Sequence, residues 1–106
     1  MEQKLFEIIT HSGDARAFAY EALKLAKAGA IEEAREKLIE SQKELDLAHN
    51  TQTKLIQAEA SGERFELSLL LIHAQDQLMT SISEKTLIEN MVEMYIEIKD
   101  LKKMIK

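Results

Sequence analysis

The chain contains no proline in its 106 residues, and its only glycines are Gly13, Gly29 and Gly62. Because proline and glycine supply most tight turns, this shortage gives poor support to turn-rich all-β folds and to Rossmann-type folds. Gly29 and Gly62 separate three segments in which apolar residues recur at helical spacing. We expect helices to end at these two glycines. The sequence therefore predicts an all-α protein built from three long segments.

The first two segments span roughly residues 2–28 and residues 31–60. A polar stretch at residues 10–14 interrupts the apolar pattern of the first segment, which predicts a kink or a break near Gly13. The alternative is a short helix followed by a new one capped at Ser12 or Asp14. The second segment repeats in heptads, with one polar residue, Gln52, on the core line. That line is Ile31, Ala34, Leu38, Ser41, Leu45, Ala48, Gln52 and Leu55.

The third segment runs from about Arg64 to the C-terminus. Ser81 and Glu84 have capping-box spacing and permit a new helix there. We favour a continuous helix because the apolar line stays in phase across this point. Its members are Leu67, Leu71, Ala74, Leu78, Ile88, Val92 and Tyr95. A helix of about 40 residues is about 60 Å long, so we expect residues 1–106 to form one elongated domain, an antiparallel three-helix bundle.

Composition excludes several classes of function. The 14 Lys and Arg residues against 19 Asp and Glu give a net charge of −5, which argues against a nucleic-acid partner. The absence of cysteine excludes disulfides, thiol catalysis and cysteine-bound zinc. No run of about 18 apolar residues and no basic-then-apolar N-terminus occurs. We therefore expect a cytoplasmic protein without direct membrane insertion.

The third segment has apolar residues on two opposite faces of its helical wheel. The face containing Leu71 and Leu78 is the natural contact with the other two helices. Around Asp76, on the other side, lie Leu69, Ile72 and Met79. Two polar strips separate the faces: Glu66, His73, Gln77, Thr80 and Glu84 form one, and Ser68 and Gln75 form the other. Because a three-helix bundle buries one face per helix, the second face predicts self-association.

Asp76 lies in the middle of this second apolar face, where an uncompensated carboxylate is costly. If copies of the helix meet there, several Asp76 side chains converge, and either protonation or a bound divalent cation relieves their repulsion. The alternative is a hydrated Asp76 in a loosely packed face. His73 falls at the edge of the same face. From the residues alone, the pattern indicates a helical homo-oligomer with a polar spot at its interface.

Residues 72–80, IHAQDQLMT, resemble the signature of the IIA component of the lactose/cellobiose (chitobiose) family of the bacterial phosphoenolpyruvate-dependent sugar phosphotransferase system. The segments SGDAR (12–16), YEAL (20–23), AHNTQT (48–53) and EASG (59–62) are similar to other parts of that family. The resemblance covers roughly Leu5 to Leu101. It implies a phosphotransferase component with a transient phosphohistidine, and a three-helix subunit assembled as a homotrimer around the third helix.

The resemblance also implies roles for individual residues. His73 matches the histidine that accepts a phosphoryl group from the phosphocarrier protein HPr and passes it to a cysteine of the IIB component. Asp76 matches the aspartate at the trimer axis, so one divalent metal ion, Mg²⁺, is expected to be shared by three Asp76 side chains. Ala74 is more typical of the cellobiose/chitobiose branch than of the lactose branch. We therefore expect uptake of a β-linked disaccharide, with cellobiose or chitobiose favoured over lactose.

The chain departs from the family pattern at Gln77, where many members have a second histidine. We expect Gln77 to donate a hydrogen bond to the imidazole or to the phosphoryl oxygens, and Thr80 to reach the phosphoryl group as well. Gln75 is expected to face His73 of a neighbouring subunit. His49 and Gln52 are interpreted as packing residues with satisfied hydrogen bonds. A second function class stays open, namely a non-catalytic helical oligomer that serves as an interaction or regulatory module.

Overall fold

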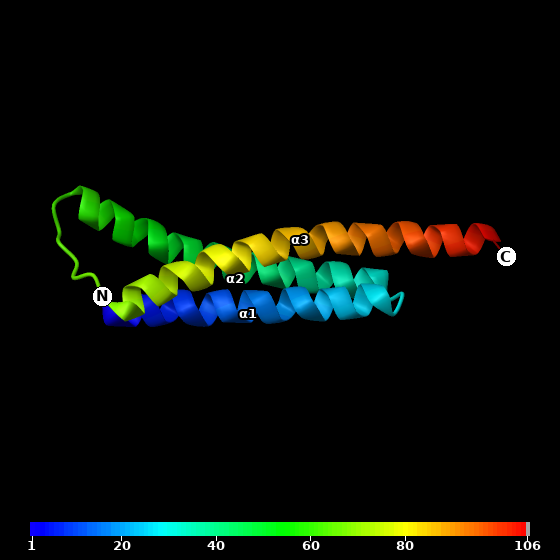
Figure 1. The fold of residues 1–106 in the computed structure, drawn as a ribbon, viewed down its shortest axis with the longest axis horizontal. Helices are drawn as coiled ribbons and strands as arrows, with labels where there is room; N and C mark the ends of the chain where they lie inside the picture. Colours follow the sequence, from blue (N-terminus) through cyan, green and yellow to red (C-terminus); the bar gives the residue numbers. More distant parts are fainter. Residues whose placement is uncertain (106) are drawn as a thin grey trace.

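The computed structural model describes residues 1–105, and these form three helices (Figure 1). They are α1 (Glu2–Lys27), α2 (Ile31–Ala60) and α3 (Leu69–Ile105). The chain runs along α1, returns along α2 and turns back again into α3, so the start of α1 and the end of α3 lie at opposite ends of the molecule (Figure 1). The molecule measures 64 × 19 × 19 Å. The prediction of an elongated all-α three-helix subunit is confirmed.

Both helix-ending glycines adopt the left-handed backbone conformation. Gly29 has φ 87° and Gly62 has φ 108°. At each turn the amide of the glycine donates to the carbonyl three residues back, and the next amide donates to the carbonyl five residues back. This is the Schellman arrangement, which satisfies carbonyls at the end of a helix and requires φ > 0 at one residue. The prediction that helices end at Gly29 and Gly62 is confirmed.

The predicted break in the first helix is wrong, because α1 is continuous through Gly13. Ser12 and Ala15 are both fully buried, so the buried face of the helix passes through the polar stretch without a break. A serine at this position occupies little space and lets the neighbouring helices approach closely. A single helical glycine costs only about 1 kcal/mol, too little to interrupt a helix held on both sides by packing.

The start of the third helix also differs from the prediction. α3 begins at Leu69, and the Ser68 hydroxyl accepts a hydrogen bond from the Leu71 amide at 3.1 Å, the geometry of an N-terminal cap. Glu66, Leu67 and Ser68 therefore belong to the connection, and their predicted places on the helical wheel are wrong. Leu67 is 81% exposed rather than on the core line. Phe65 packs against the core and anchors this connection.

The continuity of α3 through Ser81 is confirmed, and Ser81 is fully buried against the other helices. α1 packs along both α2 and α3, whereas α2 and α3 touch each other much less. Many core positions are alanine, and small side chains allow the helix axes to approach closely. Fully buried alanines are Ala15, Ala19, Ala22, Ala34, Ala48 and Ala74.

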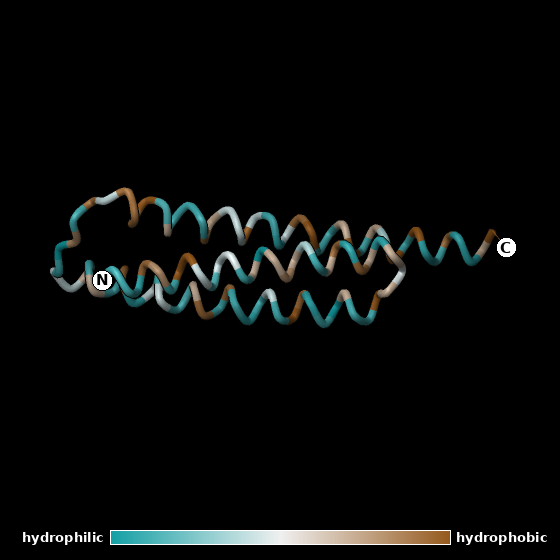
Figure 2. The backbone as a smooth tube through the Cα atoms, turned by 90° about the horizontal axis from the view of Figure 1, so that it is seen from below, coloured by the Kyte–Doolittle hydropathy of each residue, from teal (hydrophilic) through white to brown (hydrophobic). Residues whose placement is uncertain are grey.

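Two features of the shape bear on the functional site. The last turns of α2 diverge from α1 and from the start of α3 (Figure 1). At the other end, the last turns of α3 extend past the α1–α2 turn, and apolar residues continue to recur along them (Figure 2). Among residues 1–105, none of the helices combines the length and the apolar character that crossing a membrane demands.

Candidate functional site

The face of α3 that surrounds Asp76 is open to solvent in the subunit. Leu69 is 83% exposed, Ile72 is 51% exposed and Met79 is 55% exposed. Asp76 is itself exposed between them. On the opposite face, Ala74 and Leu78 are fully buried against the other helices. The prediction that α3 carries two apolar faces, only one of which the subunit buries, is confirmed.

After a polar interruption at residues 80–86, exposed apolar residues resume on the same face toward the C-terminal end of α3. Its members are separated mostly by three or four residues, which keeps them on one side of the helix. They are Leu87, Met91, Met94, Ile98 and Leu101, each at least 41% exposed. Isolated exposed apolar residues are ordinary on a protein surface, but a row of them along one face of a helix indicates an interaction surface.

His73 lies on α3 at one edge of this face. Its side chain is exposed, and the residues that the structure describes form no hydrogen bond to either ring nitrogen. The imidazole is therefore open to a protein that approaches from solvent. Because its backbone belongs to a helix packed against α1, the ring stands on a rigid support rather than on a loop. Gln77 follows one turn later on the same side of the helix.

Arg16 of α1 reaches this polar strip and was not among the predicted site residues. Its guanidinium donates hydrogen bonds to Gln77 Oε1 at 3.2 Å and to Thr80 Oγ1 at 2.5 Å. Arg16 Nε and Glu84 Oε2 are 2.5 Å apart, an ion pair without the alignment of a hydrogen bond. The sequence provides no signal for these contacts, because Arg16 and Gln77 are 61 residues apart in the chain.

The Thr80 hydroxyl is already engaged within the subunit. It donates to the carbonyl oxygen of Asp76 at 2.8 Å and accepts from Arg16. A hydroxyl has one proton to donate, so this geometry leaves Thr80 no donor for a phosphoryl group. The structure therefore gives no support to the predicted contact between Thr80 and phosphate.

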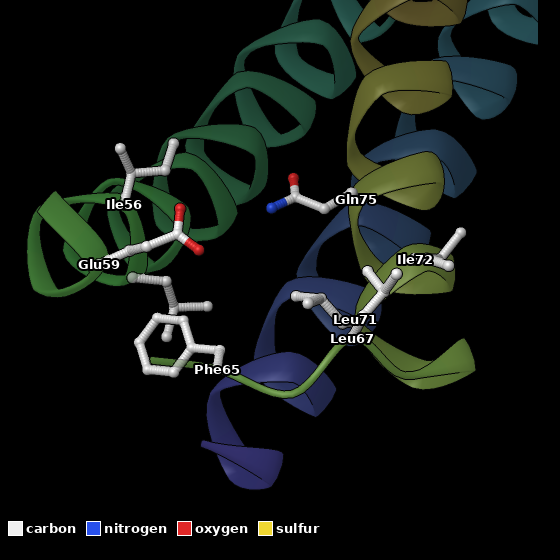
Figure 3. A pocket seen from close by; sticks show the side chains of 8 residues that line it. Ile56, Glu59, Phe65, Leu67, Leu71, Ile72 and Gln75 are labelled. Carbon is white, nitrogen blue, oxygen red and sulfur yellow. The ribbon is translucent and has the colours of Figure 1, made fainter. Parts of the chain in front are cut away.

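A groove borders the Asp76 face at the edge opposite His73, next to Gln75, where α2 diverges from α3 (Figure 3). It encloses about 320 Å³ and is lined mainly by apolar side chains. Its lining residues are Leu55, Ile56, Glu59, Phe65, Leu67, Leu71, Ile72 and Gln75. The Gln75 amide points from α3 toward α2 (Figure 3) and accepts a hydrogen bond from Gln52. Gln52 is nearly buried, which agrees with its interpretation as a packing residue with a satisfied amide.

The three histidines lie apart, which leaves His73 alone at this surface. His11 Nδ1 is 2.6 Å from Glu44 Oε2, in a partly buried contact between α1 and α2. His49 is exposed and lines a separate cavity between α2 and α3, so its interpretation as a packing residue with a satisfied hydrogen bond is wrong. Among residues 1–105, no three His, Cys, Asp or Glu side chains gather into a group able to hold a metal ion. A cation site at Asp76 therefore requires carboxylates from other copies of the chain.

Residues 3–96 match the family model described as the lactose/cellobiose-specific IIA subunit of the phosphotransferase system. The lichenan-specific IIA component of Bacillus subtilis is 48% identical over 98 residues, which cover 92% of this chain and 89% of that protein.

Two solved structures share the fold. The cellobiose-specific enzyme IIA from Bacillus anthracis superposes with a TM-score of 0.90 at 45% identity, covering 92% of this chain and 90% of that one. The IIA(chitobiose) chain of an IIA–HPr complex from Escherichia coli superposes with a TM-score of 0.81 at 40% identity, covering 92% of this chain and 95% of that one.

Proposed function

The chain belongs to the lactose/cellobiose-specific IIA family of the sugar phosphotransferase system, and from this premise we propose that it carries the phosphoryl group on His73. The observation that supports this assignment is the exposed imidazole on the rigid helix α3, beside an unpartnered face. Of the three histidines, His73 alone borders that face, whereas His11 is engaged with Glu44.

The transfer is a displacement at phosphorus. The unprotonated nitrogen of a neutral His73 ring attacks the phosphorus of the phosphohistidine on HPr. A new nitrogen–phosphorus bond forms on His73, and the corresponding bond on HPr breaks. The leaving ring departs neutral because its other nitrogen keeps its proton. In the second step a cysteine thiolate of the IIB component attacks the phosphorus, and His73 leaves as a neutral imidazole. Catalysis then depends on positioning and charge stabilisation.

The shape of the surface suits two successive protein partners. An exposed imidazole can meet HPr and then IIB in turn, whereas a ring in a deep pocket would exclude both. Support for HPr as the donor comes from the E. coli IIA(chitobiose) structure, which is a complex with HPr. The amide of Gln77, one turn from His73, is placed on the same side of α3 and supplies hydrogen-bond donors beside the phosphoryl group.

We propose that three copies of the chain associate around the Asp76 face of α3. Cyclic symmetry places two different sides of the helix in contact, so the His73 side of one subunit meets the Gln75 side of the next. The groove beside Gln75 and the exposed Ile72 are then covered, and the phosphorylation site is completed by a neighbouring subunit. The long apolar stripe of α3 supports an interface that continues toward its C-terminal end.

Three Asp76 carboxylates would converge at the axis of such a trimer. Carboxylate oxygens are the ligands that hard divalent cations prefer, and each subunit contributes one exposed Asp76 to the middle of an apolar face. We propose that the three Asp76 side chains hold one Mg²⁺ ion. When bound, the ion neutralises carboxylates that would otherwise repel each other. Its role is to hold the subunits together, and the phosphoryl transfer itself uses His73.

The sugar is inferred from relatives and from one residue. The lichenan-specific and cellobiose-specific relatives are 48% and 45% identical to this chain. Ala74 in the signature favours the same branch over the lactose branch. We therefore propose that the phosphoryl group supports uptake of a β-linked disaccharide of the cellobiose or chitobiose type.

Incubation with phosphorylated HPr, followed by intact-mass measurement, tests the phosphorylation site. We expect one phosphoryl group per wild-type chain and none on the His73→Gln variant, which should keep its helical circular dichroism. His49→Gln is the matched control, because His49 is also an exposed helical histidine but lies away from the site. Labelling of His73→Gln to the wild-type level would refute the assignment. Absence of label on the wild type would favour a non-catalytic interaction module.

Chelation tests the proposed metal. We expect a chelator to weaken association of the wild-type chains, since three unneutralised Asp76 side chains repel each other at the axis. The Asp76→Asn variant removes the charge at almost constant shape, so its association should not depend on Mg²⁺ or on chelator. Sedimentation equilibrium with and without chelator measures both. A wild-type assembly that is equally stable in both conditions would contradict the proposed site.

A further inference from the structure

Arg16 is a partly buried cation at the contact between α1 and α3, and its side chain is 28% exposed. Its guanidinium makes three contacts, all with one side of α3: Gln77, Thr80 and Glu84. This is the side of the helix that carries His73. An arginine with one contact can move freely, but one that contacts three successive turns of a neighbouring helix has little freedom left.

The contact determines which way the Gln77 amide points. Arginine has only donors, so the amide must turn its carbonyl oxygen toward Arg16. The amide nitrogen then points to the other side, where a Cβ on Gly13 would lie 3.6 Å from Gln77 Nε2. That distance is an ordinary van der Waals contact, so the amide nitrogen lies against α1 at Gly13 without being crowded. Both N–H groups of Gln77 are thereby kept away from Arg16.

The remaining contacts hold the guanidinium in place. Thr80 donates its only hydroxyl proton to the Asp76 carbonyl, so it can meet Arg16 only as an acceptor. Glu84 pairs with Arg16 Nε and offsets its charge. A charge already paired with a carboxylate attracts a phosphoryl group weakly. The arrangement therefore favours an action of Arg16 through the Gln77 amide over direct contact with phosphate.

We propose that Arg16 is a positioning residue, which orients the Gln77 amide so that its N–H groups face the phosphoryl group on His73. The inference rests on the proposed phosphorylation of His73. A phosphoryl group presents only acceptor oxygens, so an amide in the opposite orientation would place its carbonyl oxygen against them. Holding the amide in the donating orientation also removes the entropic cost of ordering a glutamine side chain during transfer.

A double-mutant cycle on the rate of transfer from phosphorylated HPr tests this. Arg16→Met is expected to slow transfer about tenfold, the value of one well-placed hydrogen bond. In a Gln77→Ala background the same change should have no further effect, because the residue through which Arg16 acts is gone. Arg35→Met is the matched control, since Arg35 is exposed on α2 and pairs with Glu32. Independent, additive losses from Arg16→Met and Gln77→Ala would overturn the proposal.

A second variant separates positioning from folding. Gln77→Glu keeps an acceptor for Arg16 and strengthens their attraction, but it has no N–H to donate. We expect it to unfold at the wild-type temperature or above and yet to transfer at least as slowly as Gln77→Ala, because its carboxylate also repels the phosphoryl oxygens. Transfer at the wild-type rate by Gln77→Glu would show that Arg16 and Gln77 serve the fold alone.

The side-chain amide signals of Gln77 in the unphosphorylated protein provide a readout that needs no phosphoryl transfer. In the wild type we expect two well-separated, slowly exchanging N–H resonances, and in Arg16→Met we expect them to move toward the values of free glutamine. Unchanged resonances would overturn the positioning role. A wild-type protein that shows the ordered amide but takes no label would instead count against the phosphorylation of His73.

Discussion

Three serines, Ser12, Ser41 and Ser81, are fully buried at the helix contacts of this alanine-rich core. Ser41 is fully buried on α2 and donates its hydroxyl to the carbonyl oxygen of Ala15 on α1 at 2.7 Å. The hydroxyls of Ser12 and Ser81 are buried as well, but the described residues offer them no hydrogen-bond partner. A paired hydroxyl stabilises the fold, whereas an unpaired one costs free energy when it leaves water.

Replacing these serines by alanine should therefore have opposite consequences. Ser41→Ala is expected to lower the free energy of unfolding by about 1 kcal/mol, because the bond to Ala15 is lost. Ser12→Ala should leave the free energy unchanged or raise it. Both changes improve helix propensity alike, so the difference between them isolates the hydrogen bond. Urea unfolding at one protein concentration measures it, and equal effects would refute the interpretation.

At the scale of elements, the three glycines show when the local sequence determines whether a helix ends. Gly29 and Gly62 follow helices, take φ > 0 and close Schellman turns, and sequence reasoning identified both. Gly13 lies inside α1, where the sequence wrongly indicated a break. The polar residues beside Gly13 are not a sign of a helix end, because Ser12 is buried in the core and His11 is hydrogen-bonded to Glu44 of α2. Local polarity cannot reveal partners that another helix supplies.

The glycines give a prediction with a built-in control. Gly29→Ala forces a Cβ into the left-handed conformation and should destabilise the protein by about 1–2 kcal/mol. Gly13→Ala places its Cβ in ordinary contact with Gln77 at 3.6 Å and should instead stabilise the protein by about 0.5–1 kcal/mol. Thermal unfolding of both variants distinguishes the two environments. Destabilisation by Gly13→Ala would mean that α1 is strained at that residue.

At the scale of the whole molecule, α3 has one apolar face that packs inside the subunit and another that is available to a partner. One face closes the subunit, and the other exposes an apolar stripe that includes Leu69, Ile72 and Leu87. The 37 residues of α3, at about 1.5 Å per residue, account for most of the subunit's 64 Å length. An elongated subunit with so exposed a stripe is suited to association side by side, as in the proposed trimer.

A charge on this stripe should break the proposed trimer. Leu87→Asp would bring one carboxylate per subunit into the apolar interface, at a cost of several kcal/mol per ion, so we expect monomers. Ile39→Asp is the matched control, because Ile39 on α2 and Leu87 are both 58% exposed in the subunit. Light scattering coupled to gel filtration measures the mass. A Leu87→Asp protein with the wild-type mass would place the interface elsewhere.

The sequence by itself determined the three helices, the two apolar faces of α3, and the placing of His73 and Asp76 at the edge and the centre of one of them. Helical periodicity specifies the direction of each side chain around its own axis, and no other element is needed for that. The contacts of Arg16 with Gln77 and the groove between α2 and α3 were decided only by the tertiary structure. Periodicity does not specify how far one helix slides along another or where two helices diverge, because these depend on the packing of all their side chains together.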